Sequence, residues 1–231
     1  MTERIRVAPY RRSAFQVALL MFVTFGLYVF VWGYFIRRAC ADLLEQEDQP
    51  VWKSVALIVP IFNFFLMFDL GKKIQGVQWR ADPRRVDGSL PWVGVSVFAF
   101  NVLGRLKGVV SNLGLLSFVP IALMQQKFSR AQIALLGEAA SPTRFHWAEW
   151  IVLVLGGAFW LLSSFGYVVS ISDWTIAPRE IAWFLGCSAL AVAVLARFGF
   201  TSRRAIADGL AMYAEPSPDR IAPYAGESPP P

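Results

Sequence analysis

Long apolar segments are the dominant pattern of this 231-residue chain. Two of them, residues 13–36 and 150–172, contain no charged side chain. A helix rises about 1.5 Å per residue, and about 20 apolar residues cross the hydrocarbon core of a bilayer. Either segment is long enough to cross a membrane, and we predict that both do so as helices.

Four shorter apolar segments follow the same pattern, three of them once their flanks are included. Together the six segments predict an all-α, polytopic membrane helical bundle of about six transmembrane helices, at 13–36, 51–68, 90–104, 109–126, 150–172 and 181–202. The third and fourth are separated only by a short basic turn. They form either a spanning hairpin or a re-entrant pair.

Composition and charge support this assignment. Hydrophobic residues make up 56% of the chain and charged residues 16%, whereas soluble domains average about 25% charged. The net charge is +6, but the basic residues avoid the apolar segments, which favours a role in membrane topology over nucleic-acid binding. Of the 22 lysines and arginines, 16 fall on the side that also holds both termini, so we expect both termini in the cytoplasm. Arg37 and Arg38 oppose this orientation locally.

The predicted domains are a basic N-terminal segment at 1–12, the bundle at 13–202 and a tail at 203–231. Residues 215–231 hold six prolines among serines, glycine and charged residues, and have few apolar groups. Such a composition cannot bury enough apolar surface to offset the entropy of ordering, so we expect this part of the tail to be disordered.

Polar side chains in or near the predicted helices are candidate binding positions, because placing them in lipid is costly. They are Asn63, Asp69, Asn101, Arg105 and Gln125. Asn63 follows Pro60, which cannot hydrogen-bond the carbonyl of Ala56, and the kink would be either a packing device or part of a polar cavity. Asp69 lies three and four residues before two lysines with which it could pair.

Two further sets suggest partners. The basic residues of the loop after the second segment are candidate lipid head-group contacts, although ordinary charge bias explains them too: Lys72, Lys73, Arg80, Arg84 and Arg85. Small residues share one face of the sixth segment and would let another helix, or a second copy, approach closely: Ala182, Gly186, Ala189 and Ala193.

The sequence offers little catalytic material. It contains no G-x-S-x-G, no H-E-x-x-H and no phosphate-binding glycine loop. His146 and Glu149 have metal-ligand spacing but no further ligands nearby, and the two cysteines, Cys40 and Cys187, are isolated. We therefore expect no enzyme activity, no cofactor and no metal.

Three short motifs carry a resemblance. They are Thr24-Phe25-Gly26-Leu27-Tyr28 with Trp32, Tyr34 and Arg37-Arg38 behind it; Ile58-Val59-Pro60-Ile61-Phe62-Asn63; and Pro120 followed by Gln125-Gln126 and Phe128-Ser129-Arg130. Over about residues 11–135 the chain resembles a bacterial family of small multi-span inner-membrane proteins classed as a domain of unknown function. The resemblance implies a bacterial inner-membrane protein and brings no activity with it.

These observations favour a non-enzymatic accessory or scaffold protein of the membrane, which binds other membrane helices or lipid. The alternative is a small transporter or channel whose path is lined by the second and fourth helices. That alternative predicts that Asn63, Asp69, Asn101 and Gln125 converge on one cavity.

Overall fold

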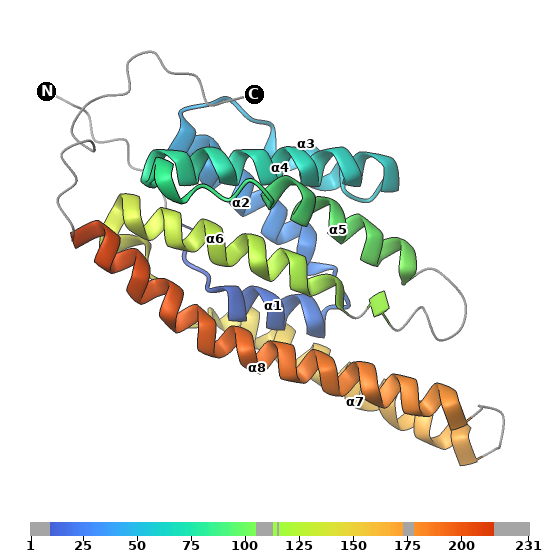
Figure 1. The fold of residues 1–231 in the computed structure, drawn as a ribbon. Coiled ribbons are helices and arrows are strands. Elements are labelled where there is room, and N and C mark those ends of the chain that lie inside the picture. The colour runs from blue at the N-terminus through green and yellow to red at the C-terminus, as the bar shows by residue number, and fades with distance from the viewer. Residues whose placement is uncertain (1–9, 105–112, 115, 173–177, 215–231) are drawn as a thin grey trace, which may run out of the picture.

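The computed structural model describes residues 10–104, 113–114, 116–172 and 178–214, and for residues 60, 161, 163–172 and 178–185 it describes the backbone alone (Figure 1). The fold is all-α. Its helices are α1 (Ala14–Val23), α2 (Tyr28–Leu44), α3 (Pro50–Ala56), α4 (Pro60–Ala81), α5 (Leu90–Leu103), α6 (Phe118–Leu136), α7 (Trp147–Ser172) and α8 (Pro178–Ala214). Short 3-10 turns follow α4 (η1, Pro83–Arg85) and α6 (η3, Gly137–Ala140).

The expected polytopic bundle of six transmembrane helices is wrong. Among the residues that the structure describes, no helix is both long enough and apolar enough to cross a bilayer. The predicted orientation of the two termini rested on those crossings and has no basis in this structure. Part of the reason is that the chain interrupts two of the expected spans.

The first expected span, 13–36, is divided at residues 24–27. Phe25 and Gly26 adopt positive φ angles of 52° and 85°, which a continuing right-handed helix does not allow. The Thr24 hydroxyl donates to the Leu20 carbonyl at 2.7 Å and accepts from the Tyr28 backbone N–H at 3.0 Å. Thr24 therefore closes the ten-residue α1 and helps to open α2.

The second expected span, 51–68, is divided at Pro60. A residue before proline avoids the helical region, and Val59 is extended with ψ of 119°. Pro60 is thus the first residue of α4 and not a kink within a helix. The Ala56 carbonyl accepts a hydrogen bond from the Val59 N–H at 3.1 Å, and α3 has only seven residues.

Charge or length distinguishes α4, α5, α6 and α8 from the expected spans. α4 has 22 residues but includes one aspartate, two lysines and an arginine, α5 has 14 residues, and α6 begins at Phe118 instead of 109 and includes Lys127 and Arg130. α8 runs 37 residues to Ala214, past the expected boundary at 202. It is tied to α6 there by an ion pair of 2.7 Å between Arg130 and Asp208. The expected disordered segment, 215–231, lies outside the described residues.

Helices α1, α4, α5, α6 and α8 form the packed centre (Figure 1). α6 packs against α1, α4, α5 and α8, while α2 packs on α3 and α4, and α7 on α1. Trp32, Met67, Phe118 and Phe128 are among the largest side chains with less than 2% exposure. This arrangement brings the residues just before α1 close to both α2 and the start of α7.

Candidate functional site

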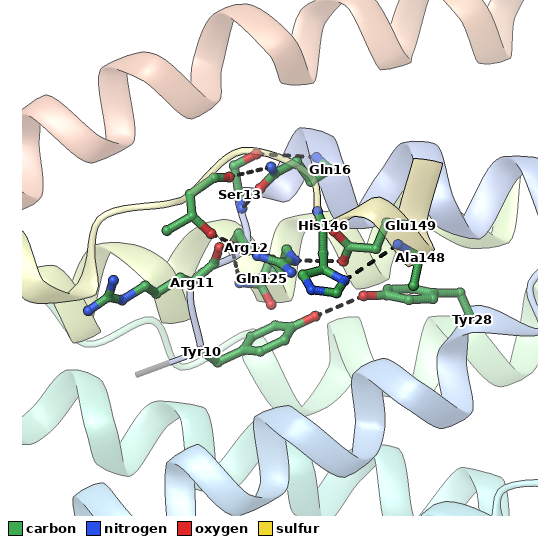
Figure 2. Close-up of polar contacts among 11 residues, drawn as sticks. Tyr10, Arg11, Arg12, Ser13, Gln16, Tyr28, Gln125, His146, Ala148 and Glu149 are labelled. Carbon is green, nitrogen blue, oxygen red and sulfur yellow. Dashed lines mark hydrogen bonds and ion pairs between the residues drawn. The ribbon is translucent and has the colours of Figure 1, made fainter. Parts of the chain in front are cut away.

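A cavity of about 790 Å³ lies beside the segment that leads into α1, between α2 and the start of α7 (Figure 2). Its polar lining includes Tyr10, Arg11, Arg12, Tyr28, Arg38 and Glu149. Its apolar lining includes Leu20, Val31, Phe35 and Val152. The cavity therefore combines charged and apolar walls.

One face of α2 supplies a wall of the cavity. Tyr28, Val31, Phe35 and Arg38 follow at spacings of three, four and three, which places them along one side of a helix. Val31 and Phe35 are 45% and 44% exposed, and the Phe35 ring stacks on the Tyr10 ring with 5.8 Å between centroids. An apolar strip thus ends in an arginine at one side and a tyrosine at the other.

An ion pair joins the segment before α1 to α7. The Arg12 Nε donates to Glu149 Oε1 at 2.6 Å, and an Arg12 Nη1 donates to the Thr143 hydroxyl at 2.9 Å. Glu149 also accepts from the His146 backbone N–H at 2.8 Å, near the start of α7. The side chains of Arg12 and Glu149 are 18% and 14% exposed, so this pair is a fixed part of the wall.

Two tyrosine hydroxyls meet in the cavity. Figure 2 shows Tyr10 and Tyr28 pointing toward one another, with 3.4 Å between their oxygens. Burial, and then the neighbouring phenol of Tyr28, raise the pKa of Tyr10 well above its usual value. Burial also raises the pKa of Tyr28. Both phenols stay protonated around neutral pH; one hydroxyl donates to the other, and the second hydroxyl can donate to a ligand.

The cavity carries an excess of positive charge. Its charged lining is three arginines and one glutamate, which leaves two positive charges. Arg12 is neutralised by Glu149, whereas Arg11 and Arg38 are exposed and form no ion pair with an acidic residue within the described part of the chain. These two guanidinium groups are the ones available to an anion.

Gln125 connects Trp32 of α2 to the segment that leads into α1. It is fully buried; its carbonyl accepts from the Trp32 ring N–H at 2.8 Å, and its amide nitrogen donates to the Arg12 carbonyl at 2.7 Å. Ser129 donates to the same carbonyl at 3.2 Å. Ser13 and Gln16 form a capping box that begins α1 just after Arg12. Gln125 therefore positions the Arg12 backbone and is not part of the cavity lining.

A separate cluster of charges lies between α2, α3 and α4. The fully buried Arg37 contacts Asp69 at 2.9 Å and Asp48 at 3.8 Å, and it also donates to the Leu66 carbonyl. Asp48 in turn contacts Lys53 at 2.5 Å and Lys73 at 2.6 Å. Burial acts to raise the pKa of Asp48, but hydrogen bonds from the two lysines outweigh it and hold that pKa at about 2.

The structure separates the residues predicted to line a transport path. Asn63 and Asn101 line a cavity of about 250 Å³, and the buried Asn63 donates to the Leu57 carbonyl at 3.0 Å. Asp69 pairs with Arg37 instead of the lysines that follow it, and Gln125 belongs to the network described above. Arg105 lies outside the described residues. Convergence is limited to Asn63 and Asn101.

The predicted head-group contacts do not form one site. Lys73 binds Asp48, and Arg85 lies 3.3 Å from Asp82. Arg80 donates to the Leu43 carbonyl at 2.7 Å, at the C-terminal end of α2. Lys72 and Arg84 are exposed.

The small-residue face of α8 is open where the structure describes it. Gly186, Ala189 and Ala193 are exposed, while the side chain of Ala182 is not described. Helix association through this face stays a prediction. In the described parts of the chain, no group of three or more His, Cys, Asp or Glu side chains could hold a metal ion.

Sequence reasoning missed Tyr10, Tyr28, Arg38 and Glu149 as site residues. The helical spacing along α2 was a usable signal, because Tyr28 and Arg38 lie on the same helix face as Val31 and Phe35. The basic pair at 37–38 was interpreted as an obstacle to the topology and as part of a family motif, and not as a binding group. Glu149 was noticed only for its spacing from His146, and its pairing with Arg12 gave no signal because the two residues lie 137 positions apart.

The fold and site define a small all-α protein with a cationic, partly apolar cavity. Residues 12–107 match the family model described as Domain of unknown function (DUF4234). The match supports the expected resemblance to a domain-of-unknown-function family over the first two motifs and ends before the third, at Pro120. It covers α1 to α5 of the structure, whereas Glu149 and α7 lie beyond it. No curated protein and no solved structure matches the chain.

Proposed function

We propose that the chain is a non-enzymatic binding protein of a cell membrane, and that its cavity holds an anionic lipid. The observation that carries this proposal is one cavity that is lined both by an apolar strip and by two arginines, Arg11 and Arg38, that pair with no acidic residue in the described part of the chain. Arg11 and Arg38 bind the anionic head group, and one hydroxyl of the Tyr10–Tyr28 pair is a further donor. Val31 and Phe35 contact the first part of an acyl chain.

The mixed lining excludes simpler ligands. A small inorganic anion would leave Val31 and Phe35 uncovered, and a purely apolar ligand would desolvate arginines without pairing them. An amphiphile with one anionic end satisfies both walls at once. A cavity of about 790 Å³ also falls in the range of typical ligand sites.

The titratable groups of the cavity support binding over catalysis. Glu149 is held as a carboxylate partner of Arg12, and the Nδ1 of His146 lies 3.4 Å from the Ala148 backbone N–H. Burial raises the pKa of both tyrosines, so neither phenol is poised to act as a base near neutral pH. These groups are arranged to donate hydrogen bonds and to hold charge.

Exposed apolar side chains support the membrane location. Leu27, Trp52, Leu162 and Phe200 are each more than 65% exposed, and they come from the α1–α2 turn, α3, α7 and α8. Large apolar side chains that are exposed on four separate elements support contact with lipid or with other proteins. The motif resemblance makes the bacterial inner membrane the proposed compartment.

Lipid binding by variants tests the proposal. Native mass spectrometry of the full-length protein, titrated with phosphatidylglycerol, measures the affinity, and phosphatidylcholine serves as the uncharged-head-group comparison. Arg38→Gln is expected to weaken phosphatidylglycerol binding about fivefold, the effect of losing roughly 1 kcal/mol from a partly solvated charge pair. Arg203→Gln, at an exposed position of α8, is the matched control and should leave the affinity unchanged.

Glu149→Gln sharpens the test because the proposal predicts that it changes the affinity for phosphatidylglycerol in the opposite direction to Arg38→Gln. Removing this carboxylate frees Arg12 and adds a net positive charge to the cavity, so phosphatidylglycerol should bind more tightly. Equal affinity for the two lipids, together with no response to either cavity variant, would refute the proposal.

A further inference from the structure

The bend between α3 and α4 presents an apolar outer surface. Its exposed side chains include Trp52, Ile58, Ile61, Phe62 and Phe65, each more than half exposed. We call residues 51–65 the apolar elbow. None of them lines the cavity of about 790 Å³ proposed to bind lipid, so a role for the apolar elbow stands independently of the proposed ligand.

The polarity of the apolar elbow is reversed relative to a surface that faces water. Its only polar side chains besides the tryptophan are Lys53, Ser54 and Asn63. Ser54 and Asn63 are buried, at 5% and 6% exposure, and the Lys53 ammonium lies 2.5 Å from Asp48. Polar groups therefore point inward, while valine, isoleucine and phenylalanine point outward, which is the arrangement expected against acyl chains.

The face of α4 that carries the exposed Ile61 and Phe65 becomes basic further along the helix. It carries side chains at spacings of four, three and four: Ile61, Phe65, Phe68 and Lys72. The Lys72 ammonium lies 5.5 Å from the centroid of the Phe68 ring, and the exposed Trp92 ring packs on Phe68 with 5.7 Å between centroids. Tryptophan and lysine are typical of the boundary between acyl chains and head groups.

The spacing of these groups matches one leaflet. Lys72 lies about 18 Å along the helix axis from the start of α4, at about 1.5 Å per residue. Half of the hydrocarbon core is about 15 Å thick. With the apolar elbow among acyl chains, Lys72 and Trp92 would reach the head groups.

We propose that the apolar elbow inserts into one leaflet of a bilayer, with Lys72 and Trp92 at the head-group level. Lipid is favoured over a protein partner because protein interfaces combine apolar contacts with about one hydrogen bond per 100–200 Å². The outward side chains of the apolar elbow offer almost no hydrogen-bonding group apart from the Trp52 ring N–H. A basic residue and a tryptophan at the right distance instead complement an anionic membrane surface.

Site-specific fluorescence tests this insertion. Both native cysteines, Cys40 and Cys187, are buried, so a cysteine introduced at Ile58→Cys or Phe62→Cys can be labelled selectively with an environment-sensitive dye. The full-length protein is placed with vesicles of phosphatidylcholine and phosphatidylglycerol whose acyl chains carry nitroxide quenchers. Glu47→Cys, at an exposed position just before α3, is the matched control.

The expected result is a blue-shifted emission and strong quenching by acyl-chain nitroxides at positions 58 and 62, with neither at position 47. A label at 58 and 62 that is quenched by aqueous iodide and not by acyl nitroxides overturns the inference. Protection from both quenchers also overturns it, because a protein would then cover the surface. A cavity that fails to bind lipid leaves these readings unchanged, so the two proposals can fail separately.

An independent variant measures the strength of the contact. Ile61→Ser combined with Phe65→Ser removes two outward apolar groups without touching Asn63 or the buried charges. Flotation with the same vesicles should fall about tenfold or more, since each change removes a large exposed apolar side chain. Unchanged flotation together with unchanged helix content would contradict insertion of the apolar elbow.

Discussion

Asp48 organises the charges inside the fold. Its carboxylate is within 4 Å of Arg37, Lys53 and Lys73, while Asp69 supplies the second negative charge of the cluster. Three cations and two carboxylates thus meet between α2, α3 and α4, where the side chains of Arg37 and Asp48 are fully buried and those of Lys53 and Asp69 are partly exposed. The cluster depends on Asp48 because removing one partner of a buried ion pair leaves the others uncompensated.

Asp48→Asn is expected to reduce the free energy of unfolding by about 3 kcal/mol near neutral pH. Chemical denaturation followed by circular dichroism measures this loss. Glu47→Gln changes an exposed neighbouring carboxylate and should alter stability by less than about 0.5 kcal/mol. Equal effects of the two substitutions would show that the buried cluster does not stabilise the fold.

The same residue predicts a pH dependence. Its pKa in the folded chain is about 2, below the ordinary value of 3.8. A lowered carboxyl pKa stabilises the folded state above the unfolded pKa, and this contribution is lost as pH falls from about 4 toward 2. The stability gap between the natural protein and Asp48→Asn should narrow by roughly 1 kcal/mol over that interval, after allowance for solvent screening. A stability difference between the two proteins that does not change with pH would contradict the ion pairs of Asp48.

Some of this residue-level chemistry could be predicted from the sequence. Arg37 stands at the end of an apolar segment with acidic residues close behind it, and a charge in that position needs a partner. Which acid it meets depends on how α3 and α4 fold back, because Asp69 is 32 positions away. The expected pairing of Asp69 with Lys72 or Lys73 was local, and the tertiary fold replaced it.

At the scale of elements, α4 and α5 pack closely because glycine lies at their contact. A Cβ placed on Gly94 would collide with the Met67 carbonyl group, and one on Gly71 would lie 2.6 Å from the Pro91 Cα. Gly94→Ala should therefore reduce the free energy of unfolding by about 2 kcal/mol, the usual effect of overpacking. Thermal unfolding followed by circular dichroism measures it.

The matched control is Gly157→Ala in α7. A Cβ at Gly157 meets nothing within 4 Å, so alanine should stabilise the helix by up to about 1 kcal/mol through its better helix propensity. If Gly94→Ala also stabilises the protein, the close approach of α4 and α5 is incorrect.

The helix boundaries show what hydropathy can and cannot predict. The apolar pattern identified helical regions but not the breaks inside them, because Phe25 and Gly26 are as compatible with a long apolar helix as with a turn. The break at Pro60 was predictable in principle, since proline restricts the preceding residue and is favoured at the first helical position. The continuation of α8 to Ala214 depends on tertiary contacts such as the Arg130–Asp208 pair.

At the scale of the whole molecule, the cavity depends on two distant parts of the chain. Arg12, Tyr28 and Arg38 lie within the matched family segment, 12–107, whereas Glu149 comes from the helix beyond it. A single sequence gives no sign that residues 137 positions apart form an ion pair. Gln125 was singled out from the sequence as a polar residue, but its role as an anchor for Arg12 and Trp32 required the fold.

Photo-crosslinking with an anionic lipid tests the proposed cavity most directly. Phosphatidylglycerol with a photoactivatable group near its head group is bound to the full-length protein, irradiated, and the adducts are mapped by peptide mass spectrometry. The account predicts adducts on residues 10–12, 28–39 and 143–152, at clearly lower yield in Arg38→Gln and at unchanged yield in Arg203→Gln. Adducts confined to other segments, with the same pattern in both variants, would contradict the assignment of this cavity as an anionic-lipid site.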